Sequence, residues 1–142
     1  MAHFTVHAHA NAPIETTWAL LYDQRGMTQW LPVTVSLEWE GDPPPDGVGS
    51  IRVLTRWPLR MREQITEVEP TSRLAYRLLS GLPVRHYVGQ TTLTTDEKGT
   101  DIEWTIDLTS PIPGIAYVVR LLIQAAATEL AKASERAAGS HT

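Results

Sequence analysis

The stretch IAYVVRLLIQAAATELAKASERAA, residues 115–138, decides the fold of this chain. It contains neither proline nor glycine and is rich in alanine, so it predicts one helix of about 24 residues, on the order of 36 Å long. The first half of the helix is apolar nearly all round, except for Arg120 and Gln124, and the second half is amphipathic. A helix that is apolar all round must be covered by another layer, so we expect a sheet to cover it.

The residues before this helix alternate between apolar and polar side chains in short runs separated by turn sequences. Such alternation is typical of half-buried strands. The predicted strands cover residues 1–10, 33–40, 48–57, 61–69, 73–79, 86–95 and 100–109, and two short helices cover residues 13–23 and 27–30. Short turns between consecutive strands favour an antiparallel meander. The predicted fold class is therefore α+β: a seven-stranded curved antiparallel sheet wrapped around the long C-terminal helix, with two short helices between the first and second strands.

Length and composition restrict the class of protein further. The chain has 142 residues, so we assign residues 1–142 to a single domain and expect the last few to form a tail. The net charge of −4 argues against a nucleic-acid partner, and the absence of cysteine excludes thiolate chemistry and fits a cytoplasmic location. The longest apolar run, residues 115–123, is too short for a transmembrane segment, and the N-terminus does not resemble a signal peptide.

Several short motifs follow one another along the chain. They are Ala12-Pro13-Ile14 followed by Trp18 and Leu21, then Trp30-Leu31-Pro32, Glu69-Pro70 with Arg73-Leu74-Ala75-Tyr76, Gly99-Thr100 with Trp104, and Pro113-Gly114 before the last helix. With these motifs the chain resembles the polyketide cyclase/dehydrase and lipid-transport family (SRPBCC) of the START/Bet v 1-like helix-grip superfamily. The resemblance implies a cavity between the sheet and the long helix. Members include carriers of hydrophobic ligands, polyketide cyclases and aromatases, and regulatory subunits, so the resemblance does not choose a reaction.

The alternation of side chains along each strand predicts which of them face that cavity. In the last hairpin, closing the turn at residues 96–99 places Thr91 opposite Trp104, and opposing residues share a face. The same parity turns Tyr87 and Ile106 inward.

A second hairpin, closed at Pro70, places Tyr76 on the same face as Glu63. A bulge near residues 67–68 would shift this register, because a one-residue slip moves every side chain to the other face. On the preceding strand we expect Arg52 to face outward. The residues expected to face inward there are Ile51, Val53 and Thr55.

Glu63 is the one carboxylate that this parity places inside. An unpaired carboxylate against apolar walls has a raised pKa and can act as a general acid or base near neutral pH. With Tyr76 and Tyr87 nearby, Glu63 is our candidate catalytic residue, able to protonate or deprotonate a polyketide carbonyl or enol. The alternative is that it pairs with Arg52 or Arg56 at or near the surface.

Aromatic and apolar side chains provide the candidate ligand contacts. The predicted ligand-binding set is Trp30, Tyr76, Tyr87, Thr91, Trp104, Ile106, Val118 and Leu122. For the aromatic members the alternative is ordinary core packing, since a buried Tyr or Trp needs only a partner for its polar tip. Trp30 lies shortly before Pro32 at the expected cavity mouth, where it would either gate the entrance or pack the second short helix.

Three histidines near the N-terminus share one face of the first strand: His3, His7 and His9. Two of them could hold a zinc ion with a third ligand. No acidic or further histidine motif completes the set, so we expect no metal site. The sequence also lacks a glycine-rich phosphate loop and the motifs G-x-S-x-G and H-E-x-x-H, and we expect no cofactor.

Three functions stay open at this point. The first is binding of a small hydrophobic or aromatic ligand, lipid- or polyketide-like, by burial of its apolar surface in the cavity. The second is a polyketide cyclase, aromatase or dehydratase that uses acid–base groups in the same cavity. The third is an interaction module whose interior is filled by side chains, and a homodimer is also left open. We favour binding, because a single carboxylate is thin support for a mechanism.

Overall fold

The computed structural model describes residues 2–139, and the tail expected at the end of the chain lies outside them. The elements in chain order are β1 (Ala2–Ala10), α1 (Ile14–Tyr22), η1 (Arg25–Gln29), β2 (Thr34–Trp39), β3 (Ile51–Arg56), β4 (Leu59–Glu69), β5 (Arg73–Ser80), β6 (Arg85–Asp96), β7 (Gly99–Thr109) and α2 (Ile115–Gly139). The short 3₁₀ helix η1 follows α1, so two short helices separate β1 from β2 as the sequence predicts. No helix in the described part of the chain is both long and apolar enough to cross a bilayer.

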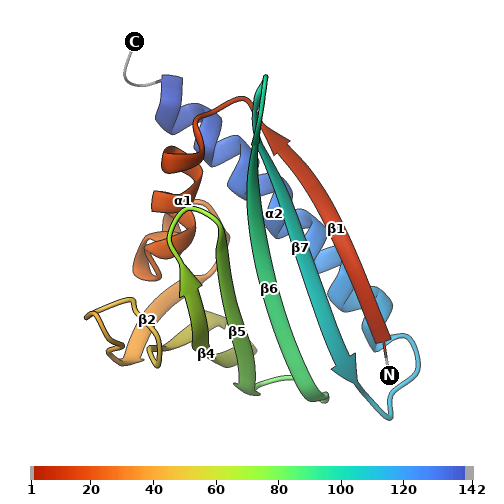
Figure 1. The fold of residues 1–142 in the computed structure, drawn as a ribbon. Helices are drawn as coiled ribbons and strands as arrows, with labels where there is room; N and C mark the ends of the chain where they lie inside the picture. Colours follow the sequence, from red (N-terminus) through yellow and green to blue (C-terminus); the bar gives the residue numbers. More distant parts are fainter. Residues whose placement is uncertain (1, 140–142) are drawn as a thin grey trace.

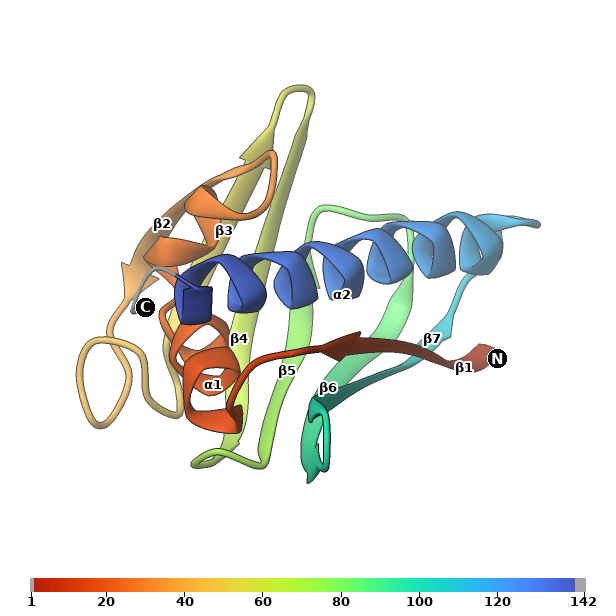
Figure 2. The ribbon, with the colours of Figure 1, turned by 90° about the horizontal axis from the view of Figure 1, so that it is seen from above.

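The strands form one antiparallel sheet in the order β1-β7-β6-β5-β4-β3-β2. Strands β2 to β7 are neighbours in sequence order, and antiparallel pairing allows such strands to be joined without a long crossover. β1 instead pairs with β7, so the first and last strands lie side by side. The sheet curves around α2 (Figure 1), and α2 lies across its concave side (Figure 2). This is the α+β helix-grip architecture expected from the sequence.

The register of the β6–β7 hairpin follows strand parity. Thr91 pairs with Trp104, as predicted from the turn between the two strands. A bulge between Arg85 and Val88 interrupts the ladder near its other end, but Tyr87 still faces the interior and is buried. The parity rule therefore places the inward-facing side chains of this hairpin correctly.

One stripe of side chains on α2 packs into the core. Its buried residues include Val119, Ile123 and Leu130, at the spacing that one helix face requires. The expectation that the sheet covers the whole first half of this helix is wrong, because Tyr117 is 66% exposed and Leu121 is 54% exposed. The helix contacts β1, β7 and α1 through one side only, which leaves the opposite side of an apolar segment in solvent.

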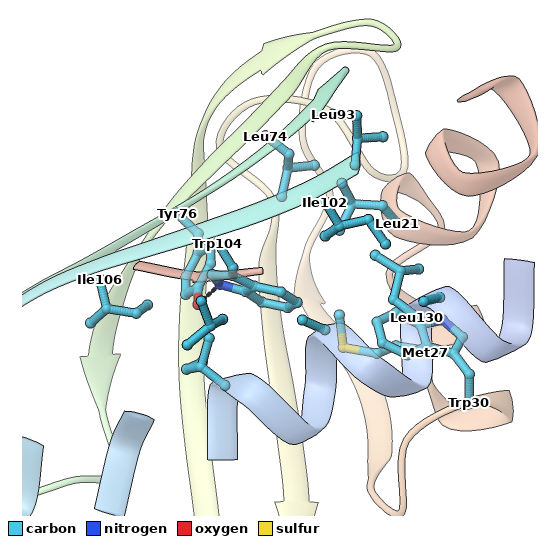
Figure 3. Close-up of a cluster of buried hydrophobic side chains, with 14 of the residues drawn as sticks. Leu21, Met27, Trp30, Leu74, Tyr76, Leu93, Ile102, Trp104, Ile106 and Leu130 are labelled. Carbon is cyan, nitrogen blue, oxygen red and sulfur yellow. Dashed lines mark hydrogen bonds between the residues drawn. The ribbon is translucent and has the colours of Figure 1, made fainter. Parts of the chain in front are cut away.

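The core fills the space between the sheet, the short helices and the second half of α2. Figure 3 shows Tyr76 and Trp104 on the sheet, Met27 from η1 and Leu130 from α2 converging in one cluster. These side chains are almost completely buried. The packed cluster continues into the space where the candidate site lies.

Candidate functional site

A cavity of about 670 Å³ lies between the concave face of the sheet, the segment around η1 and α2. Its wall includes Trp30 next to η1, Trp104 on β7 and Ile123 on α2. Small-molecule sites typically have volumes of about 300–1,000 Å³ and mostly apolar walls. The sheet and α2 therefore leave room for a small molecule between them.

A buried ion pair forms part of the cavity wall. Arg52 on β3 and Glu63 on β4 are directly opposite in the ladder, and their side chains are 2% and 7% exposed. Nε and Nη2 of Arg52 both donate to Oε1 of Glu63, at 2.8 and 2.7 Å. Both residues line the cavity. Because the pair is shielded from water, removal of either partner would leave an uncompensated charge.

The pairing corrects the interpretation of Glu63 made from the sequence. Glu63 is inside, as predicted, but it is not an unpaired carboxylate. The alternative of a pair with Arg52 is confirmed, although the pair is buried rather than at the surface. A carboxylate that already accepts two N–H groups at one oxygen is a poor match for the isolated acid–base group expected of a catalyst.

The inward position of Arg52 contradicts the sequence prediction, which faced it outward. The β3–β4 ladder places Arg56 opposite Leu59 across a two-residue turn, and counting back along both strands places Arg52 opposite Glu63. Opposing residues share a face, so Glu63 cannot be inside without Arg52. The expectation that Ile51, Val53 and Thr55 face the cavity is wrong for the same reason, although Val53 is buried. The two-residue turn was the signal that could have corrected it.

Two further side chains surround the guanidinium of Arg52. Its Nη1 donates to Oε1 of Gln24, which is fully buried just after α1. Nε2 of Gln24 donates in turn to the carbonyl oxygen of Tyr22 at 2.8 Å, which fixes the orientation of the amide. The guanidinium carbon lies 5.0 Å from the centroid of the Tyr76 ring, in cation–π geometry. The sequence did not point to Gln24, because it stands in a short connection between two helices.

Tyr76 and Tyr87 add two phenol groups to this end of the cavity. The hydroxyl of Tyr76 accepts a hydrogen bond from Nε1 of Trp104 at 3.1 Å (Figure 3), and its ring centroid lies 6.3 Å from that of Tyr87. Burial and, second, the negative charge of Glu63 raise the pKa of Tyr76. Burial also raises the pKa of Tyr87 well above its ordinary value. Both phenols are therefore protonated near neutral pH and can donate hydrogen bonds.

Gly89 makes room for the ring of Tyr76. The two residues are opposite each other in the β5–β6 ladder. A Cβ atom at position 89 would lie too close to the ring and the hydroxyl oxygen of Tyr76. A glycine inside a strand often marks such a close approach. The ring of Tyr76 is thus held against the sheet, beside Arg52.

Most, but not all, of the predicted site residues line the cavity. Those that do are Trp30, Glu63, Tyr76, Tyr87, Trp104 and Leu122. Thr91 and Ile106 are fully buried but are not part of the wall. Val118 is 49% exposed and is not part of the wall, although Leu122, one turn further along the same side of α2, is. Binding of a ligand by the lining residues stays a prediction.

Trp30 brings an unpaired donor to the wall. Its ring is buried and lines the cavity, and its Nε1 has no hydrogen-bond partner among residues 2–139. Buried donors nearly always have a partner, which can be ordered water.

Among the lining residues that the sequence did not suggest are Met27, Leu54, Leu59 and Ala126. They come from elements that meet only in the folded chain.

The histidines of β1 lie beside acidic residues that the sequence analysis did not connect with them. Nδ1 of His3 lies 2.6 Å from Oδ1 of Asp107, and Nε2 of His9 lies 3.2 Å from Oδ1 of Asp96. One ligand atom each from His9, Asp96 and Asp101 lies within 4.8 Å of the others. The acidic partners were missed because they belong to β6 and β7, which are distant in sequence. The group is at the surface, away from the cavity.

A curved antiparallel sheet that grips a C-terminal helix and leaves a cavity beside it is a helix-grip fold of the Bet v 1-like type. Within this class the chain belongs to the polyketide cyclase/dehydrase and lipid transport family, whose model matches residues 1–135. No curated protein sequence matches the chain.

Solved structures with the same fold include proteins of very different sequence. A protein from Nitrosospira multiformis has a TM-score of 0.80 at 16% identity, covering 94% of this chain and 96% of that chain. XoxI from Bacillus cereus has a TM-score of 0.76 at 17% identity, with 99% and 98% covered. Ara h 8.0201 has a TM-score of 0.73 at 17% identity, with 98% of both chains covered. At these identities the likeness shows the fold alone.

Proposed function

We propose that this protein binds one hydrophobic or aromatic small molecule in the cavity between the sheet and α2. The observation that supports the proposal best is the cavity itself, about 670 Å³ with a mostly apolar wall that also contains the buried Arg52–Glu63 pair. Membership of a family that includes ligand-binding proteins agrees with it. The ligand would be held mainly by burial of its apolar surface.

The volume sets the size and the affinity of the ligand. A cavity of about 670 Å³ corresponds to roughly 20 water molecules of ~30 Å³ each, and a ligand of about 20 non-hydrogen atoms fills a similar volume. At about 0.3 kcal/mol per atom such a ligand gains on the order of 6 kcal/mol. This corresponds to a dissociation constant of a few tens of micromolar, and good shape complementarity would tighten it.

The polar group at Arg52 suggests the chemistry of the ligand's polar end. A guanidinium has five N–H donors, and the contacts with Glu63 and Gln24 use three of them. The two remaining donors can bind an oxygen acceptor. Because Glu63 already balances the charge of Arg52, a ligand carboxylate would be repelled by Glu63. We therefore infer a neutral oxygen group, such as a ketone, ester, alcohol or phenol.

The enzymatic alternative, a polyketide cyclase, aromatase or dehydratase, depended on Glu63 as an acid–base group. The bond between Glu63 and Arg52 does not support that role, because the carboxylate is held by a structural partner. The high pKa values of Tyr76 and Tyr87 also make these phenols hydrogen-bond donors rather than bases. We therefore propose binding without an assigned reaction.

The experiment is to fill the cavity and measure binding of the neutral dye Nile red by fluorescence. Ala126 lines the cavity, whereas Arg120 lies on the same helix, is exposed and is not part of the wall, so Ala126→Trp and Arg120→Trp are a matched pair. We expect Ala126→Trp to weaken binding at least tenfold and Arg120→Trp to bind like the wild type. Ala125→Trp, on the more exposed part of the wall, serves if Ala126→Trp does not fold. Equal binding by the wild type and both cavity variants would refute the proposal.

A second measurement concerns the polar end alone. A long-chain methyl ketone and the fatty acid of equal length are compared as competitors of the dye at neutral pH. We expect the ketone to compete better, and Arg52→Lys to reduce the difference. If the fatty acid competes better, binding in the cavity stands but the inference of a neutral oxygen group is wrong.

A further inference from the structure

Large apolar side chains are exposed on two elements that border the cavity. On the tip of the β3–β4 hairpin Trp57 is 89% exposed, and Leu59 beside it is partly exposed. On the first half of α2 the exposed apolar residues are Tyr117, Val118, Leu121 and Leu122. Folded monomers seldom expose this much apolar surface in one region without a use for it. The outward side of α2 is the same surface that the sequence predicted would be covered.

The two elements flank one opening. Leu59 on the hairpin and Leu122 on α2 both line the cavity, so each exposed group of side chains continues into its wall. In Figure 2 the β3–β4 hairpin extends beyond the line of α2, and the connection from β5 to β6 lies between them. Leu82 of this connection also lines the cavity. The exposed apolar residues therefore surround the cavity mouth.

The charge at this mouth is opposite in sign to that of the whole chain. The chain has 16 acidic and 12 basic residues. The three segments around the mouth, residues 55–62, 80–88 and 111–125, contain arginines and no Asp or Glu. These arginines are Arg56, Arg60, Arg62, Arg85 and Arg120, of which Arg120 lies on the side of α2 opposite the mouth residue Leu122. Only Arg62 among them forms an ion pair in the part of the chain that the structure describes, with Glu38.

We propose that this apolar and arginine-rich face docks onto an anionic lipid bilayer, with the cavity mouth toward the lipid. Trp57 and Tyr117 are side chains of the type that lie at membrane interfaces, with an apolar ring and a polar tip. Apolar side chains enter the boundary between headgroups and acyl chains, and the arginines attract anionic headgroups. Docking in this position lets a hydrophobic ligand pass between bilayer and cavity without crossing water.

A second copy of the chain fits this face less well. In a symmetric dimer the same surface meets itself, so arginines would lie against arginines. Residues 55–62, 80–88 and 111–125 contain no carboxylate to pair with them, and Glu38 beside Arg62 is already paired. Like charges placed opposite each other disfavour association. A bilayer that contains anionic lipid supplies the opposite charge and a soft apolar layer together.

The test is sedimentation of the protein with phosphatidylcholine vesicles, with and without phosphatidylserine. Trp57→Ala is compared with Trp39→Ala. Trp39 is 67% exposed, but it is the last residue of β2 and lies at the end of that strand away from the β3–β4 turn. We expect binding only to vesicles with phosphatidylserine, weakened at least tenfold by Trp57→Ala and unchanged by Trp39→Ala. The double variant Arg60→Gln with Arg85→Gln should weaken binding roughly thirtyfold, and Lys98→Gln should not.

Three results would overturn the proposal. The first is the absence of binding to either kind of vesicle. The second is equal loss of binding in the Trp57 and Trp39 variants, which would mean that the location of the tryptophan does not matter. The third is a wild-type dimer in light scattering that Leu121→Gln converts to a monomer, because the face would then be an interface between two copies. These measurements use protein without added ligand, so they are independent of Nile red binding.

Discussion

Replacement of Arg52 by methionine is the most informative single change in the cavity wall. Methionine keeps the length and much of the apolar volume of the side chain but removes all five N–H donors. The change leaves Glu63 buried without its partner, and it leaves Oε1 of Gln24 without its donor. It also removes the cation that lies over the ring of Tyr76. Every consequence falls on groups that the structure keeps away from bulk water.

The expected magnitude follows from the burial of the pair. Loss of one partner of a buried ion pair typically costs about 3–5 kcal/mol, whereas a pair in solvent contributes about 0–1 kcal/mol. The side chains of Arg52 and Glu63 are 2% and 7% exposed, so the larger figure applies. Replacement of both, Arg52→Met with Glu63→Leu, removes the uncompensated charge. We expect the double variant to recover most of the loss, because well-packed apolar replacements of buried pairs are often neutral.

The assay is urea unfolding of the wild type, both single variants and the double variant, followed by tryptophan fluorescence. We expect the free energy of unfolding of Arg52→Met to fall by about 3–5 kcal/mol. The coupling energy between the two sites should exceed about 2 kcal/mol, because the residues are in direct contact. If Arg52→Met costs less than about 1 kcal/mol, the pair is as hydrated as a surface pair and the description of a dry polar wall is wrong.

Two further predictions concern the tyrosines. We expect Gly89→Ala to destabilise the fold by about 1–3 kcal/mol in the same assay, because the added methyl group must displace the ring of Tyr76; an unchanged free energy of unfolding would show that the ring is not held there. Because burial raises the pKa of Tyr76 and Tyr87 above the ordinary 10.0, the folded state keeps protons that the unfolded state loses at higher pH. The free energy of unfolding should therefore be unaffected by these tyrosines below about pH 10 and fall above it, by up to about 1.4 kcal/mol per pH unit for each tyrosine. Tyr76→Phe should remove part of this slope. An equal slope in the wild type and in Tyr76→Phe would contradict the prediction.

The sequence predicted those parts of the fold that depend on local pattern. Alternation of side chains and short turns determine the order and direction of the strands, and the turn between β6 and β7 fixes the register that pairs Thr91 with Trp104. The long helix was predictable because residues 115–138 contain no helix breaker. Local sequence is sufficient wherever a turn sets the register.

The failures occurred where the structure depends on contacts between distant parts of the chain. The apolar periodicity of α2 shows that Tyr117 and Leu121 are hydrophobic but does not show how much of the helix the sheet can reach. Arg52 was placed on the wrong face because the turn at the end of β3 was not used to set the register. The hydrogen bond between Gln24 and Arg52 could not be predicted, because it forms only when the segment after α1 meets β3 in the folded chain.

The candidate site was predicted in part. Strand parity brought Glu63, Tyr76 and Trp104 to one face, and they do line the cavity. The chemical character of Glu63 could not be derived without its neighbour, because a carboxylate inside a sheet is defined by what lies opposite it. The volume of the cavity is set by how far α2 stands from the sheet, and no local pattern determines that distance.

The most direct measurement of the central claim is native mass spectrometry of protein purified without detergent or added ligand, followed by solvent extraction of any bound molecule. We predict one hydrophobic molecule with a neutral oxygen group per chain in the wild type and in Arg120→Trp, and none in Ala126→Trp. Protein of bare mass that also fails to take up Nile red would contradict it, as would a bound molecule that Ala126→Trp retains in full.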